Sequence, residues 1–517
     1  MTDPIFAPSR RAVVAGGAVL LGAPTILRAQ QLFAAYPFRL GVAAGEPAAD
    51  GFVIWTRLAP DPLGEHGGMP MGAPVAVDWQ VASDERFEMV VAKGTALARP
   101  ELAHSVHVEV AGLLPDRPYF YRFTVGAERS QRGRARTLPL PGAAVGNVRF
   151  GVVGCQNYED GLFTAYRHIA REDLQFVFHY GDYIYEGRDT PTQTGDRPIV
   201  REHAGQKLFD LADYRRRYAQ YKLDPDLQAS HASAAWFAVF DDHEVENNWA
   251  GDTDQENDPP EVFALRRAAA FQAYYEHMPF RITSFPGPGG MRIHRRAKVG
   301  TLLDLHLLDT RQFRTDQPCG DDFKPVCAAV ADPAARMMSA DEERWLFAAL
   351  AERRARWNGI AQQVMMMPLD RRTHAEPASI RNMDSWGGYD APRERLFGHL
   401  AGLGNAVVLT GDEHQNWAGE LRTRGGQGEA VAVEFVTTSI SSGGDGNDTR
   451  PGNDRIMAEN PFLKWTNDRR GYATCEVTPD AWTTRFRVVE RVTTPGAPVT
   501  TAATATVEHG RPALTLA

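Results

Sequence analysis

The chain has 517 residues, of which 43% are hydrophobic and 23% are charged, and its formal net charge at pH 7 is -9. This length allows a large core and two or three structural units, and the composition is ordinary for a soluble globular protein. Because the negative charge is mild and spread along the chain, nucleic acid is disfavoured as a specific partner.

The N-terminus has the features of an export signal. Arg10 and Arg11 precede a modest apolar stretch that ends in small residues near Ala29. This pattern predicts a twin-arginine signal peptide over residues 1–29, the twin-arginine translocase as a partner during export, and a periplasmic or secreted mature protein. The apolar stretch is shorter than the roughly 20 residues that span a membrane. We therefore expect no stable membrane span after cleavage; a single-pass anchor is the alternative.

Residues 36–138 are predicted to form an N-terminal β-sandwich domain. Apolar and polar residues alternate between turn residues in the segments 52–58, 75–83, 105–113 and 118–125. This pattern is typical of a small antiparallel sandwich of the fibronectin or immunoglobulin type. A linker rich in Pro, Gly and Ala then leads into a second unit over residues 147–500.

The second unit alternates predicted strands with predicted helices, which indicates an α/β domain. Helical periodicity is found over 163–174, 261–278 and 339–357, and the last of these begins with a capping-box pair, Ser339 and Glu342. Further strands are predicted over 301–309 and 359–368. The segment 430–441 and the segments after Tyr472 are expected to form the second sheet of a sandwich.

Four short apolar runs each end at a residue type that binds metal ions. The runs and the residues that follow them are 148–154 before Cys155, 174–181 before Asp182 and Tyr185, 235–240 before Asp241, Asp242 and His243, and 406–411 before Asp412 and His414. Runs of this kind are typical of buried strands in a parallel or mixed sheet. In such sheets ligands bind beyond the carboxyl ends of the strands. The sequence therefore predicts a metal site at this edge, with more than one ion.

Several ordered motifs resemble those of the alkaline phosphatase D (PhoD-like) family of calcineurin-like metallophosphoesterases. They are GDYIYEG at 181–187, FDDHEVENN at 240–248, LDTRQFR at 308–314 and TGDEHQNWAGEL at 410–421. The resemblance implies a two-sheet α/β metallophosphoesterase sandwich with helices outside, preceded by the small all-β sandwich. It also implies an exported alkaline phosphatase or phosphodiesterase that acts on a phosphoester small molecule or a phospholipid and uses Fe3+ and Ca2+.

The resemblance and the donor chemistry together predict six metal ligands: Cys155, Asp182, Tyr185, Asp242, Asp412 and His414. Fe3+ favours anionic oxygen ligands and also accepts a thiolate, so the first three suit it. Asp242 and Asp412 stand where related enzymes carry Asn and His, and their hard oxygens suit Ca2+. The ligand set of the second ion stays incomplete, because only Gln362 and Gln363 stand where a further His is expected.

Two residues are predicted to act directly on the phosphoester. A metal-bound hydroxide or oxo group is expected to attack phosphorus, and His243, next to Asp242, is expected to protonate the leaving group. Arg311 is expected to clamp the phosphoryl oxygens with its planar fork. The alternative for Arg311 is a structural ion pair with Asp309 or Asp182. Asp241 and Glu244 are expected to support the ligands, and His179 to lie in the core.

Other interpretations stay open. Within the same family a phospholipase D-type phosphodiesterase is an alternative, and an iron redox protein or a non-catalytic binding protein are less favoured classes. Cys319 and Cys327 enclose a turn-rich segment, which suits either a small disulfide loop in an oxidising compartment or two free thiols.

Overall fold

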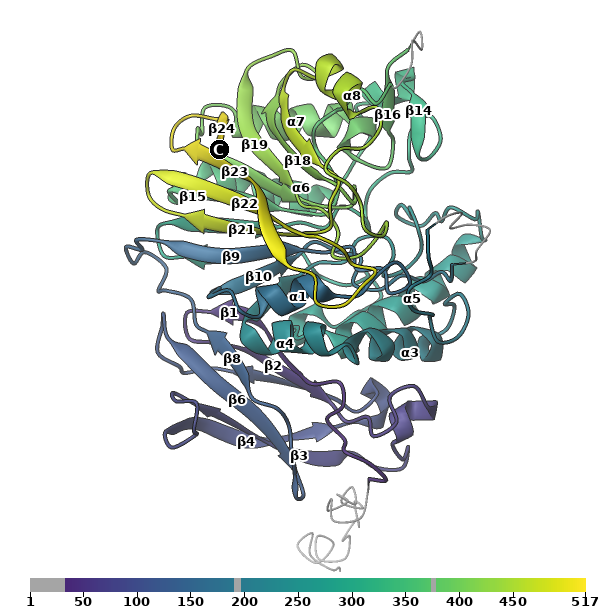
Figure 1. Cartoon of the computed structure of the whole chain (residues 1–517), viewed down its shortest axis with the longest axis vertical. Helices are drawn as coiled ribbons and strands as arrows, with labels where there is room; N and C mark the ends of the chain where they lie inside the picture. Colours follow the sequence, from purple (N-terminus) through teal and green to yellow (C-terminus); the bar gives the residue numbers. More distant parts are fainter. Residues whose placement is uncertain (1–32, 190–196, 373–377) are drawn as a thin grey trace, which may run out of the picture.

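Two β-sheets packed face to face, with helices on their outer faces, form the centre of the molecule (Figure 1). The computed structural model describes residues 33–189, 197–372 and 378–517. The predicted signal peptide over 1–29 lies outside these described residues.

The first sheet has ten strands in the order β24-β23-β22-β21-β9-β10-β11-β1-β2-β5. Their bounds, in chain order, are β1 Val42–Ala48, β2 Gly51–Arg57, β5 Ser105–Val110, β9 Val148–Val153, β10 Phe176–His179, β11 Ala235–Ala238, β21 Gly471–Val477, β22 Ala481–Val489, β23 Val499–Glu508 and β24 Leu514–Leu516. The central strands β9, β10 and β11 are parallel to one another. Their carboxyl ends therefore share one edge.

The second sheet has seven strands in the order β12-β13-β15-β17-β19-β18-β20. Their bounds are β12 Arg295–Val299, β13 Leu303–Leu307, β15 Trp357–Ala361, β17 Ala406–Thr410, β18 Asn416–Arg422, β19 Ala430–Val436 and β20 Leu463–Asn467. Aromatic pairs join the two sheets: the rings of Trp357 and Trp482 are 6.0 Å apart, and those of Phe435 and Phe486 are 6.1 Å apart. Strands covered on both faces in this way require the continuous apolar runs seen in the sequence.

Helices cover the outer faces of both sheets. Their bounds are α1 Thr164–Ile169, α3 Leu211–Lys222, α4 Pro225–Ser233, α5 Pro260–His277, α6 Ala340–Ala351, α7 Asp390–Leu400 and α8 Asn453–Glu459. Leu346 of α6 and Phe397 of α7 share a core with Ile360 and Val408 of the second sheet. Tyr218 of α3 and Tyr274 of α5 belong instead to the core of the first sheet. The predicted α/β sandwich with external helices is therefore confirmed.

The start of α6 shows half of the predicted capping box. The Ser339 hydroxyl accepts a hydrogen bond from the backbone N–H of Glu342 at 3.1 Å. The Glu342 carboxylate accepts instead from the backbone N–H of Asp309 at 2.8 Å. This side chain therefore ties the helix to the loop after β13.

Two expectations about the later strands differ from the structure. The strand predicted over 359–368 ends at Ala361, and Met365, Met366 and Met367 are buried beyond it. The segments after Tyr472 do not join the second sheet, because β21 pairs antiparallel with β9 of the first sheet. Alternating burial alone does not specify which sheet a strand joins.

The N-terminal sandwich is built partly from the first sheet. A separate sheet has the order β4-β3-β6-β7, with β8 also paired to β6; its strands are β3 Val75–Ala82, β4 Val90–Ala98, β6 Pro118–Val125, β7 Glu128–Arg129 and β8 Gly133–Arg136. It packs on β1, β2 and β5 through residues such as Val77, Tyr121 and Ile54. Since β1 pairs in parallel with β11, the sheet runs without a break from the N-terminal unit into the α/β unit.

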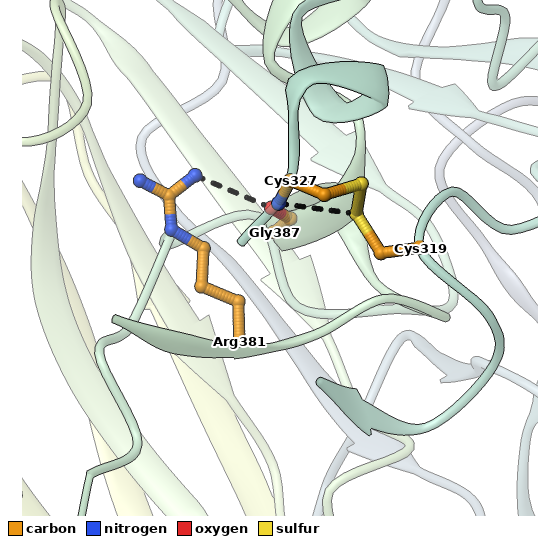
Figure 2. Close-up of a disulfide and its surroundings, with 4 residues drawn as sticks. All are labelled: Cys319, Cys327, Arg381 and Gly387. Carbon is orange, nitrogen blue, oxygen red and sulfur yellow. Dashed lines mark hydrogen bonds between the residues drawn. A yellow bond between two sulfur atoms is a disulfide. The ribbon is translucent and has the colours of Figure 1, made fainter. Parts of the chain in front are cut away.

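A small two-stranded ribbon lies at the periphery. β14, Phe323–Pro325, pairs antiparallel with β16, Ile380–Asn382. Beside it, Cys319 and Cys327 form a disulfide, as Figure 2 shows. Of the two alternatives left open by the sequence, the structure has the disulfide.

The continuous sheet predicts that the α/β unit does not fold well alone. A fragment starting at residue 147 would expose the edge of β11 and the apolar side chains that β1 covers, and unpaired sheet edges promote aggregation. We expect this fragment to be largely aggregated in size-exclusion chromatography, whereas the chain from residue 33 elutes as a folded species. A monomeric fragment with a cooperative thermal transition would contradict this expectation.

Candidate metal centre and active site

The predicted strand ends meet between the two sheets. Because β9, β10 and β11 are parallel neighbours, Cys155, Asp182 and Asp242 leave the first sheet at the same edge. β17 of the second sheet ends at Thr410, two residues before Asp412. The first three side chains are buried, and Asp412 is half-buried. Both sheets therefore contribute to one site.

Left-handed backbone conformation follows three of these four strands, β9, β10 and β17. The φ angles are 50° at Cys155, 56° at Asp182, 68° at Asp412 and 51° at His414. Such angles are uncommon and unfavourable for residues other than glycine, and they persist where the surrounding structure holds them, often at functional sites. The four side chains are therefore aimed by backbone turns of the same kind.

The donor atoms of the site form three overlapping groups, and within each group they lie within 4.8 Å of one another. The groups are Cys155 with Asp182 and His414, Asp182 with Asp242 and His243, and Asp241 with Asp242 and Asp412. Asp182 and Asp242 each belong to two groups. A carboxylate shared in this way is suited to bridge two neighbouring cations.

Tyr185 completes the set of predicted metal residues. Its hydroxyl donates to Asp182 at 2.8 Å, lies 3.0 Å from Nε2 of His414, and accepts from the Ser442 hydroxyl at 2.7 Å. The structure thus places all six predicted residues in one site. That they bind metal stays a prediction.

The electrostatics of the site favour multivalent cations. Burial, followed by neighbouring carboxylates, raises the pKa of Asp182, Asp412 and Cys155 well above their ordinary values. Oδ1 of Asp182, Oδ1 of Asp242 and Oδ2 of Asp241 are buried without a hydrogen-bond partner among the described residues. Such oxygens are costly to bury, and a bound cation supplies the missing partner and reverses the pKa shifts. The residues present therefore fit a metal centre.

Glu244 holds two of the ligand-bearing loops together. Its carboxylate accepts hydrogen bonds from the backbone N–H groups of Asp182 at 3.1 Å, Tyr183 at 2.7 Å and Asp241 at 2.9 Å. Burial raises the pKa of Glu244 to about 8, although these N–H groups oppose the rise. The side chain faces the backbone of the loops after β10 and β11, which agrees with the supporting role expected from the sequence.

His243 lies beside the clustered carboxylates with a partner that the sequence did not identify. Its Nδ1 is 2.6 Å from Oε2 of Glu186, and the other oxygen of Glu186 accepts from the backbone N–H of Asn247 at 3.0 Å. Burial by itself lowers the pKa of His243, but Glu186, Asp242 and Asp182 together raise it well above its ordinary value. The contact with Glu186 therefore holds the imidazole in a fixed orientation.

Arg311 lies in a buried ion-pair network behind the ligands. Its Nε is 2.5 Å from Asp241, its terminal nitrogens pair with Asp384, and one of them is 3.8 Å from Asp242. Arg314 pairs with the same Asp384. The Arg311 side chain has no exposed surface. This placement favours the structural alternative for Arg311, with Asp241 and Asp384 as its partners in place of Asp309 and Asp182.

Gln362, Gln363 and His179, which the sequence analysis also considered, are all buried. Gln362 and Gln363 are buried, and their side-chain amides donate to the carbonyl oxygens of Val364 and Leu308. His179 is fully buried and stacks on Trp236, with ring centroids 5.6 Å apart. The two glutamines are thus occupied by the protein itself, and His179 is a core residue as expected.

Two cavities border the site. One, of about 370 Å³, includes Tyr185, His243 and His414 in its lining. The other, of about 380 Å³, includes Asn247, Asn248 and Asp412. Substrate-sized spaces therefore reach the candidate metal centre on the His243 side and on the Asp412 side.

Sequence reasoning missed Glu186 and Asp384. Glu186 follows Tyr185 directly in the GDYIYEG motif, so its place in the motif was the available signal. Asp384 follows the short strand β16, which has no apolar run to mark it. Its role depends on contacts with Arg311 and Arg314, about seventy positions away in the sequence.

Comparison with known proteins identifies the family. Residues 150–486 match the family model described as PhoD-like phosphatase, and residues 24–139 match the PhoD-like phosphatase N-terminal domain. The chain is 47% identical over 477 residues to a protein named alkaline phosphatase D from Bacillus subtilis (strain 168), which covers 91% of this chain and 81% of that protein.

Two solved structures have folds similar to that of this chain. The structure titled "Structure of PhoD" matches with a TM-score of 0.90 and 45% identity, over 94% of this chain and 92% of that chain. A purple acid phosphatase from yellow lupin matches with a TM-score of 0.54 and 11% identity, over 92% of this chain and 74% of that one, which shows a likeness of fold alone. With two family models and a relative that covers most of the chain, the resemblance seen in the motifs is confirmed: the chain belongs to the PhoD-like phosphatase family and is a phosphoester hydrolase.

Proposed function

We propose that the chain is an exported alkaline phosphatase or phosphodiesterase that depends on Fe3+ and Ca2+. The observation that carries this proposal is the meeting of a thiol, a phenol, an imidazole and several carboxylates, three of whose buried oxygens have no hydrogen-bond partner among the described residues. Family membership supplies the reaction class, and the donor set supplies the reason for the ions.

The donors divide between a harder, more highly charged ion and a second cation. Cys155, Asp182, Tyr185 and His414 would hold Fe3+, because thiolate and phenolate form easily only beside a strongly polarising ion. Asp242 and Asp412, sharing Asp182, would hold Ca2+ through hard oxygens. Cys155, Asp182 and His414 form one of the three donor groups, and Asp242 and Asp412 belong together to another. Tyr185 joins the first through its 2.8 Å contact with Asp182.

The protein groups would then act around the bound phosphoester. When bound, the ions would supply an activated water and neutralise charge on the phosphoryl oxygens. His243 would give its proton to the leaving oxygen, and Glu186 would hold the imidazole in position through its 2.6 Å contact. Arg311 would keep Asp241 and Asp242 in place rather than touch the substrate.

Metal analysis and activity on one sample test the proposal. We expect protein purified without chelators to contain iron and calcium, to show a visible tyrosinate-type absorption band, and to hydrolyse p-nitrophenyl phosphate or bis-p-nitrophenyl phosphate. Asp182→Asn should abolish turnover and metal loading together, because it removes a charge from two of the donor groups.

Asp480→Asn makes the same chemical change at a residue that is 94% exposed, and it should leave metal content and turnover unchanged. Zinc alone, or a metal-free protein with full activity, would contradict the proposed iron site.

The role of His243 has its own test. His243→Ala should lower kcat by roughly 100- to 10,000-fold, as expected for a lost general acid, while iron and calcium stay bound. His399→Ala, at an exposed position of α7, serves as the control and should retain full activity. Loss of metal from His243→Ala would show that the imidazole is a ligand instead.

Export through the twin-arginine translocase is part of the same proposal. None of the helices within 33–189, 197–372 and 378–517 combines the length and the apolar character needed to cross a membrane. The Cys319–Cys327 disulfide supports an oxidising destination.

Replacing both Arg10 and Arg11 with Lys should keep the full-length chain inside bacteria that possess this translocase. Immunoblots of cell fractions would check this result. Unchanged export of the double variant would contradict the predicted signal.

A further inference from the structure

A disulfide-closed loop forms one wall of the cavity on the Asp412 side. The Cys319–Cys327 bond closes the loop (Figure 2), and β14 begins within it at Phe323. Asp322 and Phe323 line the cavity of about 380 Å³ together with Asp412. The loop therefore borders the candidate metal centre although it lies more than seventy positions from the nearest predicted ligand.

Hydrogen bonds fix this loop to the ligand-bearing segment after β11. Asp321 accepts from Nδ2 of Asn248 at 2.9 Å and from Nε2 of Gln255 at 2.8 Å. The backbone N–H of Asn248 in turn donates to Asp242 at 2.8 Å. Asn248 thus links Asp321 of the loop directly to the predicted metal ligand Asp242.

The other side of the loop is fixed by the β14–β16 ribbon. Phe323 is opposite Asn382 in this ribbon, and the backbone N–H of Met383 donates to the carbonyl oxygen of Asp322 at 2.9 Å. Asp384, which pairs with Arg311, follows directly. The position of Phe323 is therefore determined by three constraints: the disulfide, the Asp321 bonds and the ribbon.

Phe323 differs chemically from the rest of the cavity wall. Among the described residues that line this cavity it is the one apolar side chain; the others carry amide, carboxylate or guanidinium groups. Phe323 is 47% exposed, and the Arg371 guanidinium, which pairs with Glu413, lies 5.6 Å from the centroid of its ring. An exposed ring in a polar cavity gains by packing against an apolar or aromatic group, and a phosphoryl group offers no such contact.

We propose that Phe323 is a specificity-determining residue that packs against the organic group of the phosphoester, favours aromatic groups there, and is held in place by the Cys319–Cys327 disulfide. This inference rests on the proposed phosphoester hydrolysis at the neighbouring metal centre. It adds the residue that recognises the part of the substrate beyond the phosphate.

Kinetics with two monoesters test the role of Phe323. In Phe323→Ala the KM for phenyl phosphate should rise about two- to tenfold, the range expected for one lost aromatic contact, while the KM for glycerol phosphate stays unchanged. The kcat values and the metal content of Phe323→Ala should also stay unchanged. Phe323→Tyr, which keeps an aromatic ring, should have the wild-type KM for phenyl phosphate. Phe285→Ala, at another exposed phenylalanine, is the matched control.

Binding of phosphonates gives a readout without turnover. Calorimetry should show the wild-type protein binding phenylphosphonate about two- to tenfold more tightly than methylphosphonate, and Phe323→Ala binding both alike. The double variant Cys319→Ser with Cys327→Ser should lose the same preference with its metals retained. If this double variant keeps the preference, the role given to the disulfide is wrong.

The proposed phosphoester hydrolysis and the proposed role of Phe323 fail in different ways. A wild-type protein without turnover of any phosphoester would contradict the proposed function itself. A wild-type protein that hydrolyses both esters, with Phe323→Ala affecting both equally or neither, would overturn the role of Phe323 alone.

Discussion

The crowding of buried acidic groups between the two sheets is the constraint on which the rest of the structure depends. Asp182, Asp241, Asp242 and Asp412 lie close enough to raise one another's free energy when ionised, and three of their oxygens have no hydrogen-bond partner among the described residues. Multivalent cations remove this cost. The surrounding protein keeps the carboxylates near one another through the hydrogen bonds of Glu244 and the ion pairs of Arg311.

The architecture supplies that restraint through parallel strands. In each sheet the parallel strands end at a common edge, and the core between the sheets brings the two edges together. Sharp turns with left-handed backbone then aim the side chains into the gap. The N-terminal sandwich contributes indirectly, because β1 covers the edge of β11, the strand that precedes Asp241 and Asp242.

The two cavities that border the site are lined by different chemical groups. On one side, Glu186 holds His243, the proposed proton donor, beside Tyr185. On the other, the disulfide-closed loop brings an exposed aromatic ring to a wall of charged and amide groups. A phosphoester between them would meet proton transfer on one side and recognition of its organic group on the other, both organised around the same carboxylates.

The sequence by itself determined the α/β class, most central strands and the six clustered ligand candidates, because buried strands need continuous apolar runs and their ends are marked by Cys155, Asp182, Asp242 and Asp412. Only the tertiary structure decided which sheet the segments after Tyr472 join, that β1 continues the first sheet, and that Arg311 pairs with Asp384. The physical reason is that periodicity reports local burial, whereas strand order and long-range ion pairs depend on how distant segments pack.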